Sequence, residues 1–201
     1  MKSSKSGKRH PLLLYRRSID RLWKYSLFLG LVLTFFWGWV VWTETPLIPA
    51  KRTSWLLAAG VIMLAYTVFG ILARYVAYVQ PHRDHLRVVT PFLQLRISYR
   101  RIRSARPVEF ALLYPPNRIR GSQRSQLTPF YGYTAIVVEM TGYPLSPLLL
   151  RLFLPPAMVS RQSPGLVLVL PDWMAFSTEL DTFRGVWMQS QSRRRSSAPG
   201  K

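Results

Sequence analysis

Residues 25–43 read YSLFLGLVLTFFWGWVVWT, a stretch of nineteen residues without a single charge. A second uncharged stretch of the same length, residues 55–73, reads WLLAAGVIMLAYTVFGILA. At about 1.5 Å of rise per residue, each would form a helix of roughly 28 Å, close to the thickness of the hydrocarbon core of a bilayer. The two stretches predict transmembrane helices. The alternative is a fully buried helical pair in a soluble protein, although such helices are rarely apolar on every side.

The segment between the two stretches, residues 44–54, is too short for a domain. It contains Pro46 and Pro49, which suits a tight turn between antiparallel helices. Because no small-residue cleavage site follows the first stretch, we interpret it as a retained helix and not as a signal peptide. The sequence thus predicts a transmembrane hairpin with these bounds: hairpin 25–79, first span about 25–43, second span about 55–73.

Aromatic side chains stand near the ends of both stretches, where amphipathic rings meet lipid headgroups. We expect five of them to anchor the helices at the membrane interfaces: Trp23, Trp42, Trp55, Tyr75 and Tyr78. Small residues inside the stretches would let two helices approach each other closely, although the spacing Gly-x-x-x-Gly does not occur. These residues are Gly30, Gly38, Gly60 and Gly70.

The chain of 201 residues is strongly basic, with a formal net charge of +20. Sixteen of these net charges lie in residues 1–24 and 74–126. Such an excess favours a negatively charged partner: an anionic lipid surface, a nucleic acid or an acidic protein. Eight Lys and Arg residues precede the first stretch and two lie in the turn, a bias that predicts both termini in the cytoplasm and a location in the inner (cytoplasmic) membrane. We interpret residues 1–24 as a basic cytoplasmic tail, and this bias explains the charge of the tail better than attraction to anionic lipid does.

Beyond Pro81 the apolar pattern changes from continuous to alternating. Apolar and polar residues alternate through residues 93–100, which is typical of a half-buried strand. Further strands are predicted at residues 86–89, 102–110, 133–140, 148–154 and 166–170. Residues 114–130 contain Pro115, Pro116, Gly121 and Pro129, and we predict a long mobile loop there.

A helix is predicted after the last strand, with Asp172 as its N-cap and an end near Gln189. Four apolar residues at spacings of four, three and four lie along one face, which we expect to pack on the sheet: Phe176, Leu180, Phe183 and Trp187. The basic residues 191–201 are predicted to be a disordered tail.

The segment 86–105, LRVVTPFLQLRISYRRIRSA, forms two strands joined by a turn and a step toward a third. With the C-terminal helix that bears Trp187, it resembles the bacterial PH-domain (pleckstrin-homology-like) membrane proteins, in which one or two helical spans precede such a domain. The resemblance covers roughly residues 82–190. It implies a membrane α-helical hairpin plus an α+β, mainly β domain: a PH-like antiparallel barrel closed by a C-terminal helix. It also implies a binding or scaffolding module.

The sequence contains no motif for catalysis or for a cofactor. It has no cysteine, no Gly-x-Ser-x-Gly elbow and no glycine-rich phosphate loop, and the two spans carry no ionisable Asp, Glu, Lys, Arg or His. His82 and His85 stand close together, but a zinc site needs three or four ligands, so we interpret them as part of a juxtamembrane linker. We therefore predict a non-catalytic protein with no cofactor and no metal.

The most informative polar feature is a cluster of arginines, formed by Arg96, Arg100, Arg101, Arg103 and Arg106. Guanidinium groups match phosphate and carboxylate, so these residues are expected to contact lipid headgroups or an acidic partner. The alternative is a solvated sheet face whose charge protects a strand edge from aggregation. Nucleic acid is not favoured as a partner, because no aromatic residues are interleaved with the cluster as stacking platforms.

Three functional hypotheses follow from these features. The first is a membrane-anchored, PH-like interaction module, acting as a scaffold, assembly factor or accessory subunit of a membrane complex with a protein partner. The second is a sensor of anionic lipid at the membrane surface. The third is an enzyme with an unrecognised site. The sequence makes no prediction of an oligomeric state.

Overall fold

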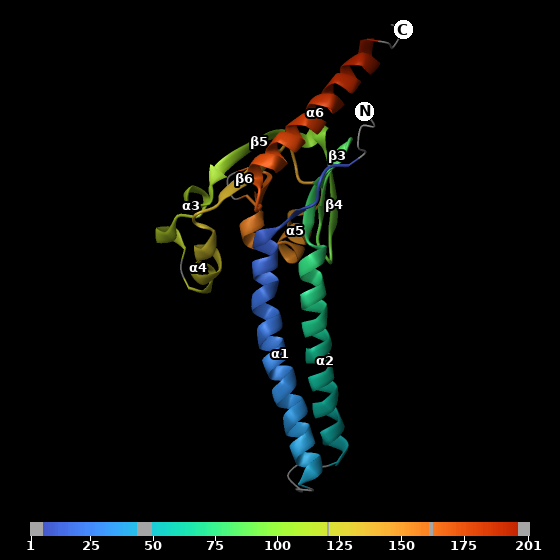
Figure 1. Ribbon diagram of the computed structural model, residues 1–201, viewed down its shortest axis with the longest axis vertical. Coiled ribbons are helices and arrows are strands. Elements are labelled where there is room, and N and C mark those ends of the chain that lie inside the picture. Colours follow the sequence, from blue (N-terminus) through green and yellow to red (C-terminus); the bar gives the residue numbers. More distant parts are fainter. Residues whose placement is uncertain (1–5, 44–49, 120, 161–162, 197–201) are drawn as a thin grey trace. The chain divides into compact units, whose positions relative to one another are not determined.

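The computed structural model describes residues 6–43, 50–119, 121–160 and 163–196, and Figure 1 traces them along the chain. The chain divides into two compact units. Residues Arg16–Tyr75 form a helical unit, and the described residues before and after them form a strand-rich unit. A mixed class of helices and antiparallel sheets is therefore confirmed.

The helical unit is made of two long helices, α1 (Leu13–Trp42) and α2 (Ala50–Val76). Both are long and apolar enough to cross a membrane. α1 begins well before the uncharged stretch, because residues 13–24 contain no glycine or proline and the helix continues through their charges. The residues predicted as an N-terminal tail are thus helical from Leu13 onward.

Small residues line the contact between α1 and α2. A Cβ atom on Gly60 would lie 2.6 Å from the Oγ1 of Thr34, and one on Gly70 would lie 3.0 Å from the Cβ of Trp23. Gly30 lies against Leu64 and Met63 in the same way, whereas Gly38 has no other side chain or distant backbone within 4 Å of a Cβ position. Three of the four glycines therefore permit close packing of antiparallel helices, and Gly38 does not.

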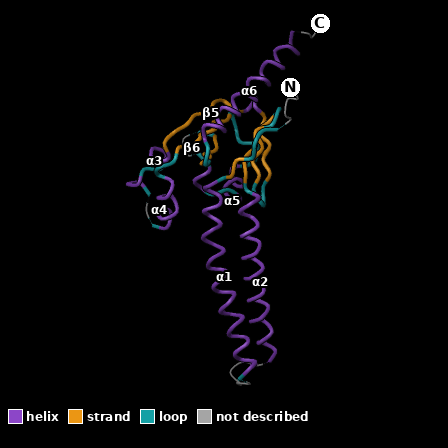
Figure 2. The backbone as a smooth tube through the Cα atoms, viewed as in Figure 1, coloured by secondary structure: helices purple, strands orange, loops and turns teal. Residues whose placement is uncertain are grey.

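The strand-rich unit contains two antiparallel sheets, coloured orange in Figure 2. One has the order β1-β2-β3-β4 and the other the order β5-β6-β7. The strands have these bounds: β1 His10–Pro11, β2 Tyr78–Pro81, β3 His85–Val89, β4 Gln94–Ser98, β5 Ile102–Glu109, β6 Thr134–Met140 and β7 Gly165–Val169. The described strands form two separate sheets and no closed barrel, so the expected barrel is not seen.

Strands β1 and β2 were not predicted, because residues 1–24 were expected to be a tail and the domain was expected to begin near residue 82. β1 lies inside the segment predicted as a basic tail, and it pairs with β2 through His10 opposite Val79 and Pro11 opposite Tyr78. Two further backbone bonds extend this pairing, from the Gly7 amide to the Pro81 carbonyl at 2.7 Å and from the Leu12 amide to the Ala77 carbonyl at 3.3 Å. The strand-rich unit therefore starts well before residue 82, and the helical hairpin is inserted between its first and second strands.

The run predicted as a strand at residues 148–154 is helix α5 (Pro147–Phe153). Proline is favoured in the first turn of a helix, where its missing N–H is not needed, and the leucines that follow have no β-branched neighbour to favour a strand. This strand prediction is wrong.

The predicted long loop at residues 114–130 is also wrong over its described part, which is largely helical. It contains the 3₁₀ turns η2 (Pro116–Arg118) and η3 (Thr128–Phe130) around helix α4 (Ser122–Leu127), and it follows the short helix α3 (Phe110–Leu113). Its prolines stand at helix starts, where their fixed φ is pre-organised. The rings of Tyr114, Phe130 and Tyr131 each contact the ring of Phe110, which joins the two ends of the segment.

The C-terminal helix α6 (Trp173–Ser196) packs on both sheets through contacts with β2 and β6. The predicted N-cap is confirmed, because the Ala175 amide donates to the Oδ1 atom of Asp172 at 3.0 Å. Phe176 and Leu180 are fully buried, while Phe183 and Trp187 are half-buried.

α6 continues past Gln189 through a stretch without glycine or proline. Residues 191–196 are consequently helical and not a disordered tail, and residues 197–201 lie outside the described part of the chain.

Candidate functional site

The predicted arginine cluster is divided among three elements. Arg96 lies on β4, Arg100 and Arg101 lie in the 3₁₀ turn η1 (Tyr99–Arg101), and Arg103 and Arg106 lie on β5. All five are exposed. The strand predicted from the alternation of residues 93–100 ends at Ser98, so that Arg96 lies on the strand and Arg100 lies in the turn that follows.

One arginine of the cluster is neutralised by a carboxylate. Arg106 forms an ion pair with Glu139, with 2.7 Å between Nη2 and Oε1, and the Ser104 hydroxyl donates to the other carboxylate oxygen at 2.8 Å. The hydrogen bond from Ser104, and then the charge and hydrogen bond of Arg106, hold the pKa of Glu139 below its ordinary value. Arg106 therefore joins β5 to β6 through its ion pair with Glu139.

A second basic surface lies on the outer face of the four-stranded sheet. Arg87 on β3 stands directly opposite Arg96 on β4. Like charges in directly opposed positions repel each other. Among the described residues neither guanidinium is paired with a carboxylate, and Arg87 instead approaches the side-chain amide oxygen of Gln94 when that amide is oriented to accept. We name Arg87 and Arg96 the arginine pair, which is suited to a phosphate or carboxylate ligand.

The two histidines next to the arginine pair stack on each other. The rings of His82 and His85 lie 5.0 Å apart and nearly parallel, in the turn between β2 and β3 and at the start of β3. Burial lowers the pKa of His82, and the charges of Arg87 and Arg96 lower it further. The pKa of His85 is lowered by burial, by His82 and by the same arginines, against the opposing effect of Asp84.

The histidines therefore belong to the sheet, and the prediction that they lie in a linker is wrong. The Tyr99 hydroxyl donates to the backbone carbonyl of His82, which fixes the turn, and burial raises the pKa of Tyr99. Within the described part of the chain, no three His, Cys, Asp or Glu side chains are grouped so that they could hold a metal ion.

An open cavity of about 550 Å³ lies beside the remaining arginines. Arg100 and Arg101 line one side of it, and Thr141, Gly142 and Tyr143 from the turn after β6 line the other. The Thr141 amide donates to the Arg101 carbonyl at 2.9 Å, which joins the two turns. The chemistry of this cavity, two guanidinium groups and two hydroxyls, is that of an anion site.

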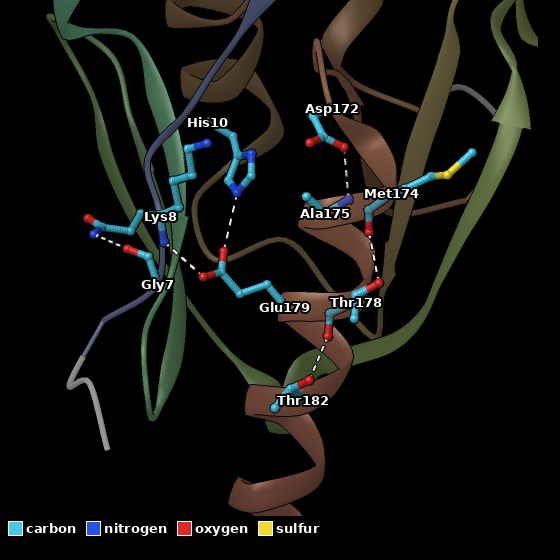
Figure 3. A network of polar contacts seen from close by, with 10 residues as sticks. Gly7, Lys8, His10, Asp172, Met174, Ala175, Thr178, Glu179 and Thr182 are labelled. Atoms are coloured by element: carbon cyan, nitrogen blue, oxygen red, sulfur yellow. Dashed lines mark hydrogen bonds and ion pairs between the residues drawn. The ribbon is translucent and has the colours of Figure 1, made fainter. Parts of the chain in front are cut away.

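The N-terminal segment is held by a polar network that the sequence analysis missed (Figure 3). Glu179 on α6 accepts a hydrogen bond from the Lys8 amide at 2.9 Å and lies 3.2 Å from the Nε2 atom of His10. His10 is buried, with its ring edge-on to Phe176 at 5.3 Å. A Cβ atom on Gly7 would lie 2.6 Å from the Glu179 carboxyl carbon, so a larger residue at this position would displace the carboxylate from its contacts with Lys8 and His10.

The expected interface aromatics fall into two groups. Trp42, Trp55 and Tyr75 are exposed on the helical unit, as lipid-facing anchors would be. Trp23 is half-buried against Gly70, and Tyr78 lies in β2 beyond the end of α2, with the Arg9 guanidinium 4.8 Å from its ring centre.

A charged cluster joins the two helices near the ends that connect to the strands. Asp20 on α1 pairs with Arg74 on α2 at 3.3 Å, and the Nε atom of Arg16 donates to the Arg74 carbonyl at 3.0 Å. The Trp23 indole donates to Asp20 at 3.3 Å. This ionic network closes the hairpin at one end.

Searches of the chain against protein-family models, curated proteins and solved structures found no match.

Proposed function

We propose that this protein is a membrane-anchored, non-catalytic interaction module that acts as a scaffold, assembly factor or accessory subunit of a membrane complex. The observation that carries the proposal is the insertion of the apolar hairpin between β1 and β2. Because β1 and β2 are paired, the chain leaves the sheet toward α1 and returns to it from α2 at neighbouring positions. An anchor inserted in this way keeps the domain attached at two points.

The exposure of the hairpin supports a lipid environment. Only 17% of the most apolar window of α1 and 22% of that of α2 are buried. The core helix of a soluble protein would bury most of such a window, since large apolar patches left in water promote aggregation. Bilayer lipid would cover these side chains instead.

The position of β1 supports a retained first helix. A signal peptide would be removed together with everything that precedes its cleavage site. Cleavage after α1 would take β1 away from β2, and it would also remove His10 from Glu179. The domain and the first helix are therefore proposed to stay in one chain, with both termini in the cytoplasm as the excess of Lys and Arg before the first span predicts.

The order of the strands supports the proposal that the strand-rich unit is a PH-like domain. A meander of four strands is followed by a meander of three and then by a long helix that touches both sheets. Antiparallel strands followed by a C-terminal helix are what the resemblance leads us to expect of a PH-like domain, although the described strands form two sheets in place of the expected closed barrel. In this interpretation the hairpin occupies the connection between the first two strands.

Native membranes provide the test of this function. The full chain should remain in the membrane after extraction with alkaline carbonate, and a defined protein should co-purify with it in constant ratio. Replacement of the arginine pair by glutamine should reduce that ratio, while Arg83→Gln, a change of an exposed arginine in the neighbouring turn, should not. Turnover of a substrate by the purified protein, or its release by carbonate, would contradict the proposal.

A second candidate function, binding of anionic lipid, is favoured by the arginine pair, because its repulsion is relieved by a bound phosphate. In that case the arginine substitutions should weaken the attachment of the domain to vesicles that contain phosphatidylglycerol, and added salt should weaken it too. The protein interaction should then be unaffected.

A further inference from the structure

A group of exposed apolar side chains lies on the strand-rich unit. Leu148, Leu149 and Leu152 project from α5, and Phe92 projects from the turn between β3 and β4. The rings of Phe92 and Phe153 lie 6.3 Å apart, which joins the helix to the turn. We name Phe92, Leu148, Leu149 and Leu152 the apolar ridge.

The packing of α5 separates the ridge from the core. Leu150 and Leu154 are fully buried and fix the helix to the domain. Leu148 and Leu152 are one helical turn apart and share the opposite face, where Leu152 keeps 73% of its surface exposed. One charge, Arg151, stands within the helix. Exposed leucines beside an arginine suit a membrane surface, where apolar side chains enter the acyl boundary and a cation meets the headgroups.

The register of the four-stranded sheet places the ridge at a defined end of the unit. Tyr78 pairs with Val89, and Val89 pairs with Gln94. The β3–β4 turn, with Phe92, therefore stands at the end of the sheet where β2 begins. Pro11 pairs with Tyr78, so β1 also ends there. The chain thus leaves for α1 and returns from α2 at the same end of the sheet that bears the ridge.

The length of the connection limits how far this end can lie from the hairpin. Tyr78, the first residue of β2, lies five positions after Ala73, the last residue of the uncharged stretch of α2. Even fully extended, five residues span at most about 18 Å. The headgroup layer on each side of a bilayer is itself roughly 5–8 Å thick. A ridge at this end of the sheet is thus within reach of the lipid.

We infer that the apolar ridge inserts into the headgroup and acyl boundary of the bilayer that the hairpin crosses. The occupant of this surface is the lipid leaflet itself, a third membrane contact beside α1 and α2. Because the ridge belongs to the same folded unit as β1 and β2, its insertion would hold the domain in one orientation at the membrane. This inference rests on the proposed membrane anchor.

Single cysteines can test the inference in the full chain, because the sequence contains no other cysteine. Bimane attached to Leu152→Cys in phosphatidylglycerol and phosphatidylethanolamine vesicles should be quenched by lipids brominated near the headgroup. The matched control is Leu112→Cys on α3, an apolar residue with 70% of its surface exposed, which should not be quenched. Phe35→Cys, exposed on α1, reports the anchor and should be quenched by lipids brominated deep in the acyl chain.

Each outcome has a distinct meaning. Quenching at Leu152 and Phe35 without quenching at Leu112 supports the inference. If Leu152 behaves like Leu112 while Phe35 is quenched, the ridge does not touch lipid and the anchor stands. If Phe35 is not quenched, the anchor itself is wrong. A blue shift at Leu152 without lipid quenching indicates coverage by protein, which also overturns the inference.

Discussion

The helical hairpin and the strand-rich unit distribute their side chains in opposite ways. In the hairpin, Ser26, Gly30, Gly60 and Thr67 are buried between or along the helices, while large apolar residues face outward. In the strand-rich unit the apolar side chains of both sheets are buried, and arginines cover the outside. The surface of the hairpin therefore suits an apolar medium, whereas the surface of the strand-rich unit suits water. Lipid is the medium in which an outward apolar surface with small residues inside is stable.

The largest expected effect compares one substitution in the two regions. Leu168→Ala, on β7 with no surface exposed, should lower the free energy of unfolding by about 2–5 kcal/mol, because it leaves a cavity in a closed core. Leu72→Ala, on α2 with 60% of its surface exposed, should leave stability in detergent nearly unchanged. Thermal unfolding of both variants, followed by circular dichroism, makes the comparison. Equal losses would mean that the hairpin is packed like a soluble core.

The next effect tests the close contact inside the hairpin. Gly60→Val should destabilise the helix pair by about 1–3 kcal/mol, because its Cβ would collide with the Thr34 hydroxyl. Gly38→Val is the control, since nothing lies within 4 Å of its Cβ position. The midpoint of unfolding of the full chain in detergent should fall for the first variant and stay constant for the second. If both variants behave alike, α1 and α2 do not pack through Gly60.

A smaller effect concerns the joint between β1 and α6. Glu179→Ala removes the partner of the His10 ring and of the Lys8 amide, and should cost about 1–2 kcal/mol because the buried His10 loses its acceptor. Trypsin should then cut faster after Lys8 or Arg9. Glu109→Ala, a change of an exposed carboxylate on β5, provides the control. An unchanged rate of cleavage for Glu179→Ala would show that this network does not hold the N-terminal segment.

The smallest effect is a pH dependence that arises in the strand-rich unit. Because the pKa values of His82 and His85 are lowered in the folded state, the unfolded state binds more protons below about pH 6.5. Their contribution is complete above pH 6.5 and is lost as the pH falls through the lowered values. Arg96→Gln should raise both pKa values, since the charge of Arg96 contributes to both shifts. Titration of the histidine ring signals by NMR would show this, and unchanged values would exclude the coupling.

The sequence correctly predicted those elements that arise from a long or regular pattern of residues. The two uncharged stretches predicted α1 and α2, and the alternation of residues 93–100 predicted β4, which ends two residues earlier at Ser98. The capping position of Asp172 predicted the start of α6. In each case the local signal and the tertiary environment agree, which is the condition under which a pattern is reliable.

The sequence did not predict those elements whose structure depends on pairing between segments that are distant in the chain. β1 has two residues and is a strand only because β2, beyond the whole hairpin, pairs with it. The run of leucines in α5 was predicted to be a strand because it is apolar, although the proline at its start favours the observed helix. In the candidate site, Arg96 was found from its exposed position. Arg87 was missed, although the same alternation on β3 places it on the outer face.

The central claim is that the hairpin crosses a bilayer and returns, so that its turn and the strand-rich unit lie on opposite sides. A membrane-impermeant maleimide applied to sealed vesicles tests it with Thr43→Cys, at the end of α1, and Thr182→Cys, exposed on α6. We predict that one of the two cysteines reacts in intact vesicles and the other reacts only after the vesicles are opened. Reaction of both cysteines in intact vesicles of uniform orientation would contradict the claim.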